Sequence, residues 1–130
     1  MNLCFPKSEH LCGSIRISEL YKSGRRFVVF PLKVTWRIGE FDTDNMPPVQ
    51  VLVWAPKSLF KRAVQRNRMR RLMREAYRLE KEPLVHYCEE KGMKMEVAFN
   101  YMTKEVRDAD DIRKAVRKAI EKIIKAETDK

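Results

Sequence analysis

The chain has few glycines, few histidines and no long apolar run, and each shortage excludes a class of protein. With only four glycines, it contains neither the P-loop nor the glycine-rich fingerprint of dinucleotide-binding proteins. Its two histidines, His10 and His86, lie far apart and outside any recognised nucleophile motif. No segment approaches the roughly 20 apolar residues of a membrane span, and the first residues lack the pattern of a signal peptide. We therefore expect a cytoplasmic protein that binds a partner and carries no catalytic residues of its own.

Metal and disulfide frameworks are also missing from the pattern. The cysteines are odd in number and contain no C-x-x-C pair: Cys4, Cys12 and Cys88. We expect them to be reduced thiols, partly buried, because neither a disulfide scaffold nor a zinc site fits this spacing. The cluster Asp108, Asp110 and Asp111 could bind magnesium. Its place before an apolar helical stripe favours helix capping instead, so no metal site is assigned to the protein.

Acidic side chains are nearly absent from one segment, Lys57 to Arg78. These 22 residues hold nine basic side chains and one acidic one, Glu75, so they carry +8 of the formal net charge of +10. Solvated helix faces usually mix both signs at helical spacing, and this segment does not. Arginine forks bind phosphate oxygens bidentately, whereas membrane-surface helices favour lysine beside exposed large apolar residues. The segment therefore predicts a nucleic-acid partner.

The basic segment also has the spacing of an amphipathic helix, at about 100° per residue. One side of that helix holds Asn67, Arg71, Arg74 and Arg78. The opposite side holds Met69, Leu72, Met73, Ala76 and Tyr77. Ser58 is a possible N-cap, and Pro83 is expected to end the helix near Glu82. Phe60, Ala63 and Val64 are out of phase, so either the first turn packs separately or the regular helix begins after Ser58.

The remaining elements predict one α+β domain over 1–130, with flexible ends at 1–10 and 126–130. A helix over 14–24 precedes strands over 27–30, 32–38, 49–54 and 93–101. A final helix carries an apolar stripe from Ile112 to Ile124. Trp36 shares the phase of Leu32 and Val34 and is expected in the core. The predicted order αβββαβα gives a sandwich in which helices cover the sheet. The acidic connection Glu40–Asn45 has no assigned role.

The run Phe60-Lys-Arg-Ala-Val-Gln-Arg-Asn-Arg-Met-Arg-Arg-Leu-Met-Arg-Glu-Ala-Tyr-Arg78 closely resembles the signature of the bacterial ribonuclease P protein component. The centre of that signature is Arg-Asn-Arg, here Arg66, Asn67 and Arg68. The order of the other elements is similar to the family's layout over most of the chain. The resemblance implies a left-handed crossover through the basic helix, where the residues alone would predict the common right-handed form.

The resemblance also implies a function in tRNA maturation. In this family a large RNA subunit removes the 5′ leader from precursor tRNA, using Mg²⁺ bound mainly by that RNA and the substrate. A monomeric protein, one per catalytic RNA, binds both the ribonuclease P RNA and the leader. The implied RNA-binding residues are Lys57, Lys61, Arg62, Arg66, Asn67, Arg68, Arg70, Arg71, Arg74 and Arg78. The implied leader-binding residues, in a cleft between the first helix and the sheet, are Tyr21, Phe27 and Phe30.

Two alternatives come from other classes of protein. A ribosomal-protein-like module would bind structured RNA with the same charge and fold, and only the Arg-Asn-Arg signature separates it from the first interpretation. A DNA-binding regulator would place the basic helix in a major groove. Such a regulator needs side chains that read bases, but this helix is nearly all arginine, which mainly contacts phosphates.

Overall fold

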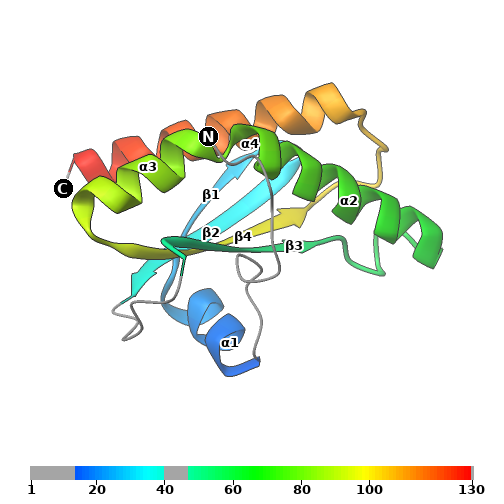
Figure 1. Cartoon of the computed structure of the whole chain (residues 1–130). Coiled ribbons are helices and arrows are strands. Elements are labelled where there is room, and N and C mark those ends of the chain that lie inside the picture. The colour runs from blue at the N-terminus through cyan, green and yellow to red at the C-terminus, as the bar shows by residue number, and fades with distance from the viewer. Residues whose placement is uncertain (1–13, 40–46, 130) are drawn as a thin grey trace.

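The computed structural model describes residues 14–39 and 47–129. Its elements are α1 (Ser14–Ser23), β1 (Arg25–Val29), β2 (Leu32–Gly39), β3 (Val49–Trp54), α2 (Ala63–Glu80), α3 (Glu82–Lys91), β4 (Lys94–Tyr101) and α4 (Ala109–Thr128). The sheet lies between α1 on one face and α2, α3 and α4 on the other (Figure 1). This confirms the predicted α+β sandwich. Cys4, His10, Cys12 and the Glu40–Asn45 connection lie outside the described residues.

The four strands are ordered β1-β2-β4-β3. Strands β1 and β2 form an antiparallel hairpin whose turn contains Phe30 and Pro31, so the proline lies in the connection between the strands. Strand β4 pairs antiparallel to β2 and parallel to β3. Because β3 and β4 are parallel, α2 and α3 form the crossover between them. The left hand expected for this crossover stays a prediction.

The structure contains one helix, α3, that the predicted order lacks. Pro83 does end the basic helix, since α2 stops at Glu80, but it also lies in the first turn of the next helix. A proline is tolerated there because the first N–H groups of a helix have no partner inside it. Leu84 and Cys88, four residues apart, are fully buried, and Gly92 ends α3 with a left-handed φ of 63°. The correct order is αβββααβα.

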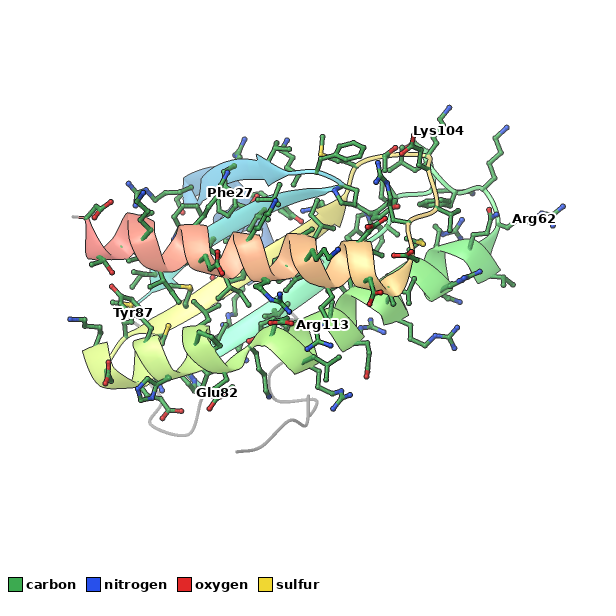
Figure 2. All side chains as sticks on the ribbon, turned by 90° about the horizontal axis from the view of Figure 1, so that it is seen from above. Phe27, Arg62, Glu82, Tyr87, Lys104 and Arg113 are labelled. Carbon is green, nitrogen blue, oxygen red and sulfur yellow. The ribbon has the colours of Figure 1, made fainter. Side chains whose placement is uncertain are left out.

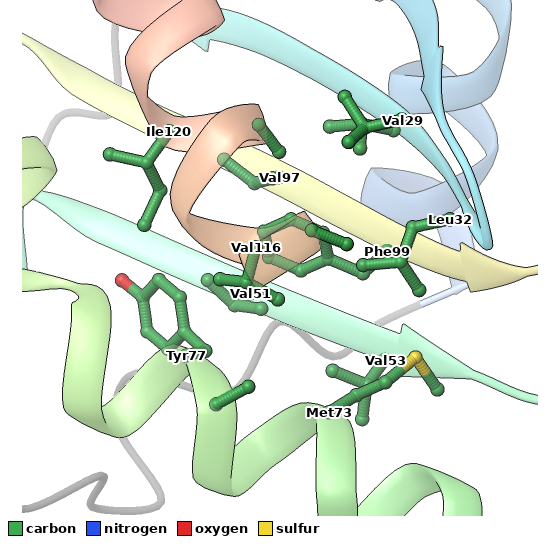
Figure 3. Close-up of a cluster of buried hydrophobic side chains, with 14 of the residues drawn as sticks. Val29, Leu32, Val51, Val53, Met73, Tyr77, Val97, Phe99, Val116 and Ile120 are labelled. Atoms are coloured by element: carbon green, nitrogen blue, oxygen red, sulfur yellow. The ribbon is translucent and has the colours of Figure 1, made fainter. Parts of the chain in front are cut away.

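The main core lies between the sheet and the three helices on one of its faces. Figure 3 shows Met73 and Tyr77 of α2 directed toward strand residues such as Val51 and Val53. The predicted stripe of α4 is confirmed, since its fully or almost fully buried residues are Ile112, Ala115, Val116, Ala119, Ile120 and Ile123. Trp36 is 4 % exposed and belongs to this core, as predicted. Burial also raises the pKa of the Cys88 thiol to about 12, with Glu127 and Glu89 adding to the effect.

Two features of α4 bear on the sequence predictions. The Asp108 carboxylate accepts a hydrogen bond from the backbone N–H of Asp111 at 2.9 Å, which confirms the capping interpretation. At the other end the helix continues to Thr128, so it includes part of the end 126–130 that was expected to be flexible, and that flexibility stays a prediction. The helix continues because Glu127 is buried and accepts a hydrogen bond from Trp36 Nε1 at 3.2 Å.

An ion-pair cluster ties α2 to α4. Arg113 and Arg117 both donate to the Glu80 carboxylate, and Arg113 extends from α4 toward α2 (Figure 2). The hydrogen bond from Arg117, followed by that from Arg113, lowers the pKa of Glu80 despite partial burial. This cluster fixes the C-terminal end of α2, at Glu80, whereas the helix begins beside Arg62.

Among residues 14–39 and 47–129, no helix is long and apolar enough to cross a bilayer.

Helix α1 packs on the opposite face of the sheet through apolar and charged contacts. Leu20 is fully buried against Ala98 of β4. The Glu96 carboxylate, fully buried, accepts from Arg16 Nε of α1 at 2.9 Å and from Arg37 Nε of β2 at 2.6 Å. Burial alone would lower the pKa of Arg37, but the hydrogen bond and charge of Glu96 outweigh it and raise that pKa. These contacts hold α1 close to the strands.

Candidate nucleic-acid interface

The loop that enters α2 explains why Phe60 is out of phase with the helix. The helix begins at Ala63, so Ser58 is not its N-cap, and the second of the two sequence alternatives is correct. Phe60 is buried beside the Tyr101 ring, at 5.5 Å between ring centroids. Arg66 Nη1 donates to the backbone oxygens of Phe60 and Lys61 at 2.9 and 3.0 Å. Part of the Arg66 guanidinium therefore holds this loop in place.

The two faces of α2 are separated as the spacing predicts. Its buried residues are Met69, Met73, Ala76 and Tyr77. Leu72, predicted on the same side, is half-buried. Seven of the ten predicted RNA-binding residues are exposed: Lys57, Lys61, Arg62, Asn67, Arg68, Arg71 and Arg74. The other three, Arg66, Arg70 and Arg78, are half-buried.

The exposed side of α2 forms a shallow concavity. It has a volume of about 430 Å³ and is lined by Val64, Asn67, Arg68, Arg70, Arg71 and Arg74. We call the residues Asn67, Arg68, Arg71 and Arg74 the arginine face. Several guanidinium groups around one open concavity suit a phosphate backbone, because each group can donate two parallel hydrogen bonds to phosphate oxygens.

The half-buried arginines of α2 have partners within the protein. Arg78 Nε donates to Glu75 Oε2 at 3.1 Å, and this hydrogen bond lowers the pKa of the Glu75 carboxyl. The only carboxylate of the basic segment thus neutralises its last arginine. The Arg70 guanidinium carbon lies 5.1 Å from the ring centroid of Trp54, over the indole. The start of α2, marked by Arg62, lies at the opposite end of the molecule from Tyr87 of α3 (Figure 2).

A second polar surface lies on the face of the sheet that α1 covers. A pocket of about 280 Å³ is lined by Tyr21, Arg26, Lys33, Thr35 and Asn100, and we call it the α1 pocket. Asn100 Nδ2 donates to the Tyr21 hydroxyl at 3.0 Å. Arg26 also donates to the backbone oxygen of Tyr21. The pocket therefore combines a hydrogen-bonded aromatic ring with two cationic side chains.

Comparisons with known proteins identify the family. A family model described as Ribonuclease P matches residues 5–124. A ribonuclease P protein component of Porphyromonas gingivalis W83 is 36 % identical over 117 residues, 90 % of this chain and 84 % of the relative. One from Chlorobium phaeobacteroides is 37 % identical over 102 residues, 74 % of this chain and 70 % of the relative. The chain belongs to the ribonuclease P protein family.

Solved structures of ribonuclease P proteins share the fold. The Staphylococcus aureus protein superposes with a TM-score of 0.65 at 17 % identity, over 90 % of this chain and 95 % of that one. The Thermotoga maritima protein gives a TM-score of 0.64 at 16 % identity, over 88 % of this chain and 96 % of that one. At such low identity the likeness concerns the fold alone.

The three aromatic residues predicted to bind the leader of a ribonuclease P substrate do not lie together. Tyr21 lines the α1 pocket. Phe27 lies on the other face of the sheet, where its ring packs against Trp36 at 5.3 Å between centroids and under Lys122 of α4. Figure 2, which looks onto that face, shows Phe27 beside α4. Phe30 is exposed in the β1–β2 turn below the Arg107 guanidinium. The prediction that Phe27 lies in a cleft under α1 is therefore wrong. Phe27 and Arg26 are adjacent in β1, so their side chains point to opposite faces of the sheet, and Arg26 is the one that lines the α1 pocket.

Four further candidates were not predicted from the sequence: Arg26, Lys33, Asn100 and Trp54. Lys33 could have been found, because strand alternation places it on the face away from the core. Trp54 belongs to a strand expected to be well buried, yet it is 46 % exposed. Because the strand Val49–Trp54 is mostly apolar, its sequence does not show that only Val49, Val51 and Val53 point into the main core.

The described carboxylates of this ribonuclease P family member can be examined for metal-ligand clusters. Asp108 is used as a helix cap. In the described parts of the chain, no three His, Cys, Asp or Glu residues gather as metal ligands. The described residues therefore offer no cluster that fits a resident magnesium ion.

Proposed function

We propose that this chain is the protein subunit of ribonuclease P. It binds the catalytic RNA through α2 and the 5′ leader of precursor tRNA on the α1 side of the sheet. It thereby promotes endonucleolytic removal of the leader in tRNA maturation. The observation that carries the proposal is the arginine face, exposed on a helix whose other side is buried, in a chain of this family.

The arginine face supports binding to a folded RNA. Its cations bind phosphates, and phosphate contacts release condensed counterions, so affinity depends steeply on salt. Helical RNA presents mainly phosphates, ribose hydroxyls and shape to a protein. A rigid row of arginines matches such a surface without reading its sequence. We therefore assign α2 to the catalytic RNA.

The α1 pocket supports binding to a single strand. Unpaired bases stack on aromatic rings, and cations beside the rings hold the phosphates. Tyr21, Arg26 and Lys33 provide this combination. In this proposal the RNA subunit carries out the cleavage, and Mg²⁺ is held mainly by that RNA and the substrate. The protein acts in the cytoplasm as a monomer, one per catalytic RNA.

Reconstitution tests the proposed function. We expect the RNA-free protein to leave precursor tRNA intact, and the protein mixed with ribonuclease P RNA to cleave it at a lower magnesium concentration than the RNA alone requires. Cleavage is followed by gel electrophoresis of end-labelled substrate. A general structured-RNA-binding module would not lower the magnesium requirement, and that result would refute the proposal. Cleavage by rigorously RNA-free protein would also refute it.

Tyr21→Ala should separate leader binding from tRNA binding. We expect the holoenzyme with this variant to bind leader-bearing precursor tRNA more weakly, by about 5- to 100-fold, because one stacking contact is lost. Affinity for mature tRNA should stay almost unchanged. Tyr21→Phe is the matched control, since it keeps the ring and removes only the hydroxyl that Asn100 contacts. Equal losses for both ligands would mean that Tyr21 supports the fold or the RNA interface.

A further inference from the structure

Trp54 is a large aromatic residue exposed at the end of β3, an edge strand of the sheet. The other tryptophan, Trp36, is 4 % exposed, whereas Trp54 is 46 % exposed. Strand alternation places Trp54 on the α1 face together with Leu52, and Leu52 packs against the Leu20 cluster. Trp54, two residues further on, is exposed. An indole exposed on the edge of a cationic surface is a candidate contact for a ligand.

The Arg70 side chain holds this indole from one side. Its guanidinium carbon lies 5.1 Å from the ring centroid, within the range of a cation–π contact. Its Nε is buried and, within the part of the chain that the structure describes, has no hydrogen-bond partner. The indole is therefore the contact that accounts for the position of this guanidinium. Together the two residues provide an aromatic ring for a base and a positive charge for its phosphate, and we call them the Trp54 platform.

The Trp54 platform lies between the two surfaces already described. Trp54 is in register with Asn100 on the neighbouring strand β4, and Asn100 is in register with Lys33 on β2. Lys33, Asn100 and Trp54 therefore form one row across the sheet. Asn100 and Lys33 line the α1 pocket, while Arg70 lines the concavity of the arginine face. Adjacent strands are about 4.8 Å apart, so a chain of nucleotides can reach from the pocket to Trp54.

We propose that Trp54, supported by Arg70, stacks on an unpaired base of the 5′ leader as that strand leaves the α1 pocket toward α2. The inference rests on the proposed function and adds a binding residue to it. A flat exposed indole needs a splayed base, which a single strand offers and a paired helix does not. The leader fits better than the catalytic RNA, because Trp54 shares its sheet face, and a row of paired residues, with the α1 pocket.

The free protein tests stacking without the holoenzyme. Oligoadenylate of about eight nucleotides is titrated into the wild-type protein while tryptophan emission is recorded. Trp36 is buried and gives a constant background. We expect emission to change on binding, Trp54→Leu to weaken binding about 5- to 50-fold, and Trp54→Phe to recover most of the affinity. Binding without a change of emission would refute stacking, and this titration decides the matter even if Trp54→Leu fails to fold.

The reconstituted holoenzyme tests the identity of the strand. Trp54→Leu should raise the dissociation constant for leader-bearing precursor tRNA and leave that for mature tRNA unchanged. A leader shortened until it no longer reaches the Trp54 platform should abolish the difference between variant and wild type. A weaker affinity of Trp54→Leu for ribonuclease P RNA alone would assign the base to the catalytic RNA and refute the leader assignment. Failure of the wild-type protein to bind ribonuclease P RNA would refute the proposed function, whereas the emission titration would still decide stacking.

Discussion

Met73→Ala is expected to destabilise the protein by about 2–5 kcal/mol, whereas Arg74→Ala, at the next position, is expected to change stability by less than about 0.5 kcal/mol. Met73 is fully buried against the sheet, so its truncation leaves a cavity as well as losing apolar burial. Arg74 is exposed on the arginine face. The measurement is the free energy of unfolding from denaturant titration.

The same two variants should have the opposite order of effect on RNA binding. Arg74→Ala should weaken binding to ribonuclease P RNA and lower the slope of log affinity against log salt by about one, since one phosphate contact is lost. Met73→Ala, measured where it remains folded, should keep the wild-type slope. Filter binding over a series of salt concentrations gives both values.

Leu72→Ala is a control whose effect on stability should lie between those of Met73→Ala and Arg74→Ala. Leu72 is half-buried, so its truncation should cost less stability than that of Met73 and should leave the salt slope unchanged. If Arg74→Ala unfolded the protein while RNA affinity persisted, the assignment of the two faces of α2 would be inverted.

The faces of α2 and α4 could be predicted from the sequence because each residue's side follows from a fixed rotation along the helix. Asn67, Arg71 and Arg74, and the stripe from Ile112 to Ile123, lie where this rotation places them, whereas Arg78 is half-buried. The start of α2 could not be predicted in the same way. It is set by Phe60 in the core and by Arg66 on the backbone of the entry loop, and both are contacts outside helical periodicity.

Features that depend on strand pairing also could not be predicted from the sequence. The α1 pocket exists because β1, β2 and β4 place Arg26, Lys33 and Asn100 near Tyr21, and their register is set between strands far apart in the sequence. The exposure of Trp54 likewise depends on where α1 stops covering the sheet. Helix α3 was missed for a different reason. Pro83 is compatible both with the end of one helix and with the start of another.

One buried carboxylate lies at the centre of the charged contacts between α1 and the sheet. Glu96 of β4 is fully buried and joins Arg16 of α1 to Arg37 of β2. Arg37 Nη1 also lies 3.3 Å from Oε2 of Glu19 in α1. Desolvating charges is costly, so such a cluster is stable only while each charge keeps its partners. Glu96 therefore holds α1 against the sheet and indirectly positions Tyr21 over the α1 pocket.

Glu96→Ala is expected to cost about 3 kcal/mol of unfolding free energy, within the range for removing one partner of a buried ion pair. Two arginines would lose their common carboxylate at a site where their side chains are only 30 % and 17 % exposed. Backbone amides of α1 should lose hydrogen-exchange protection before those of α4, because the charge cluster includes residues of α1 and none of α4. The holoenzyme should lose affinity for the leader more than for ribonuclease P RNA, since α2 does not contact the cluster.

Glu75→Ala is the matched control, because it also removes a carboxylate paired with arginine. The Glu75–Arg78 pair lies on the surface, and such pairs contribute about 0.2–1 kcal/mol. A double-mutant cycle separates charge from packing at the buried site. If Glu96→Ala is costly because Arg37 loses its counter-charge, then Arg37→Ala should cost less in the Glu96→Ala background than in the wild type. Additive costs would instead show that the two side chains stabilise the α1 contact through packing, and Glu96 would then not be the electrostatic anchor of that helix.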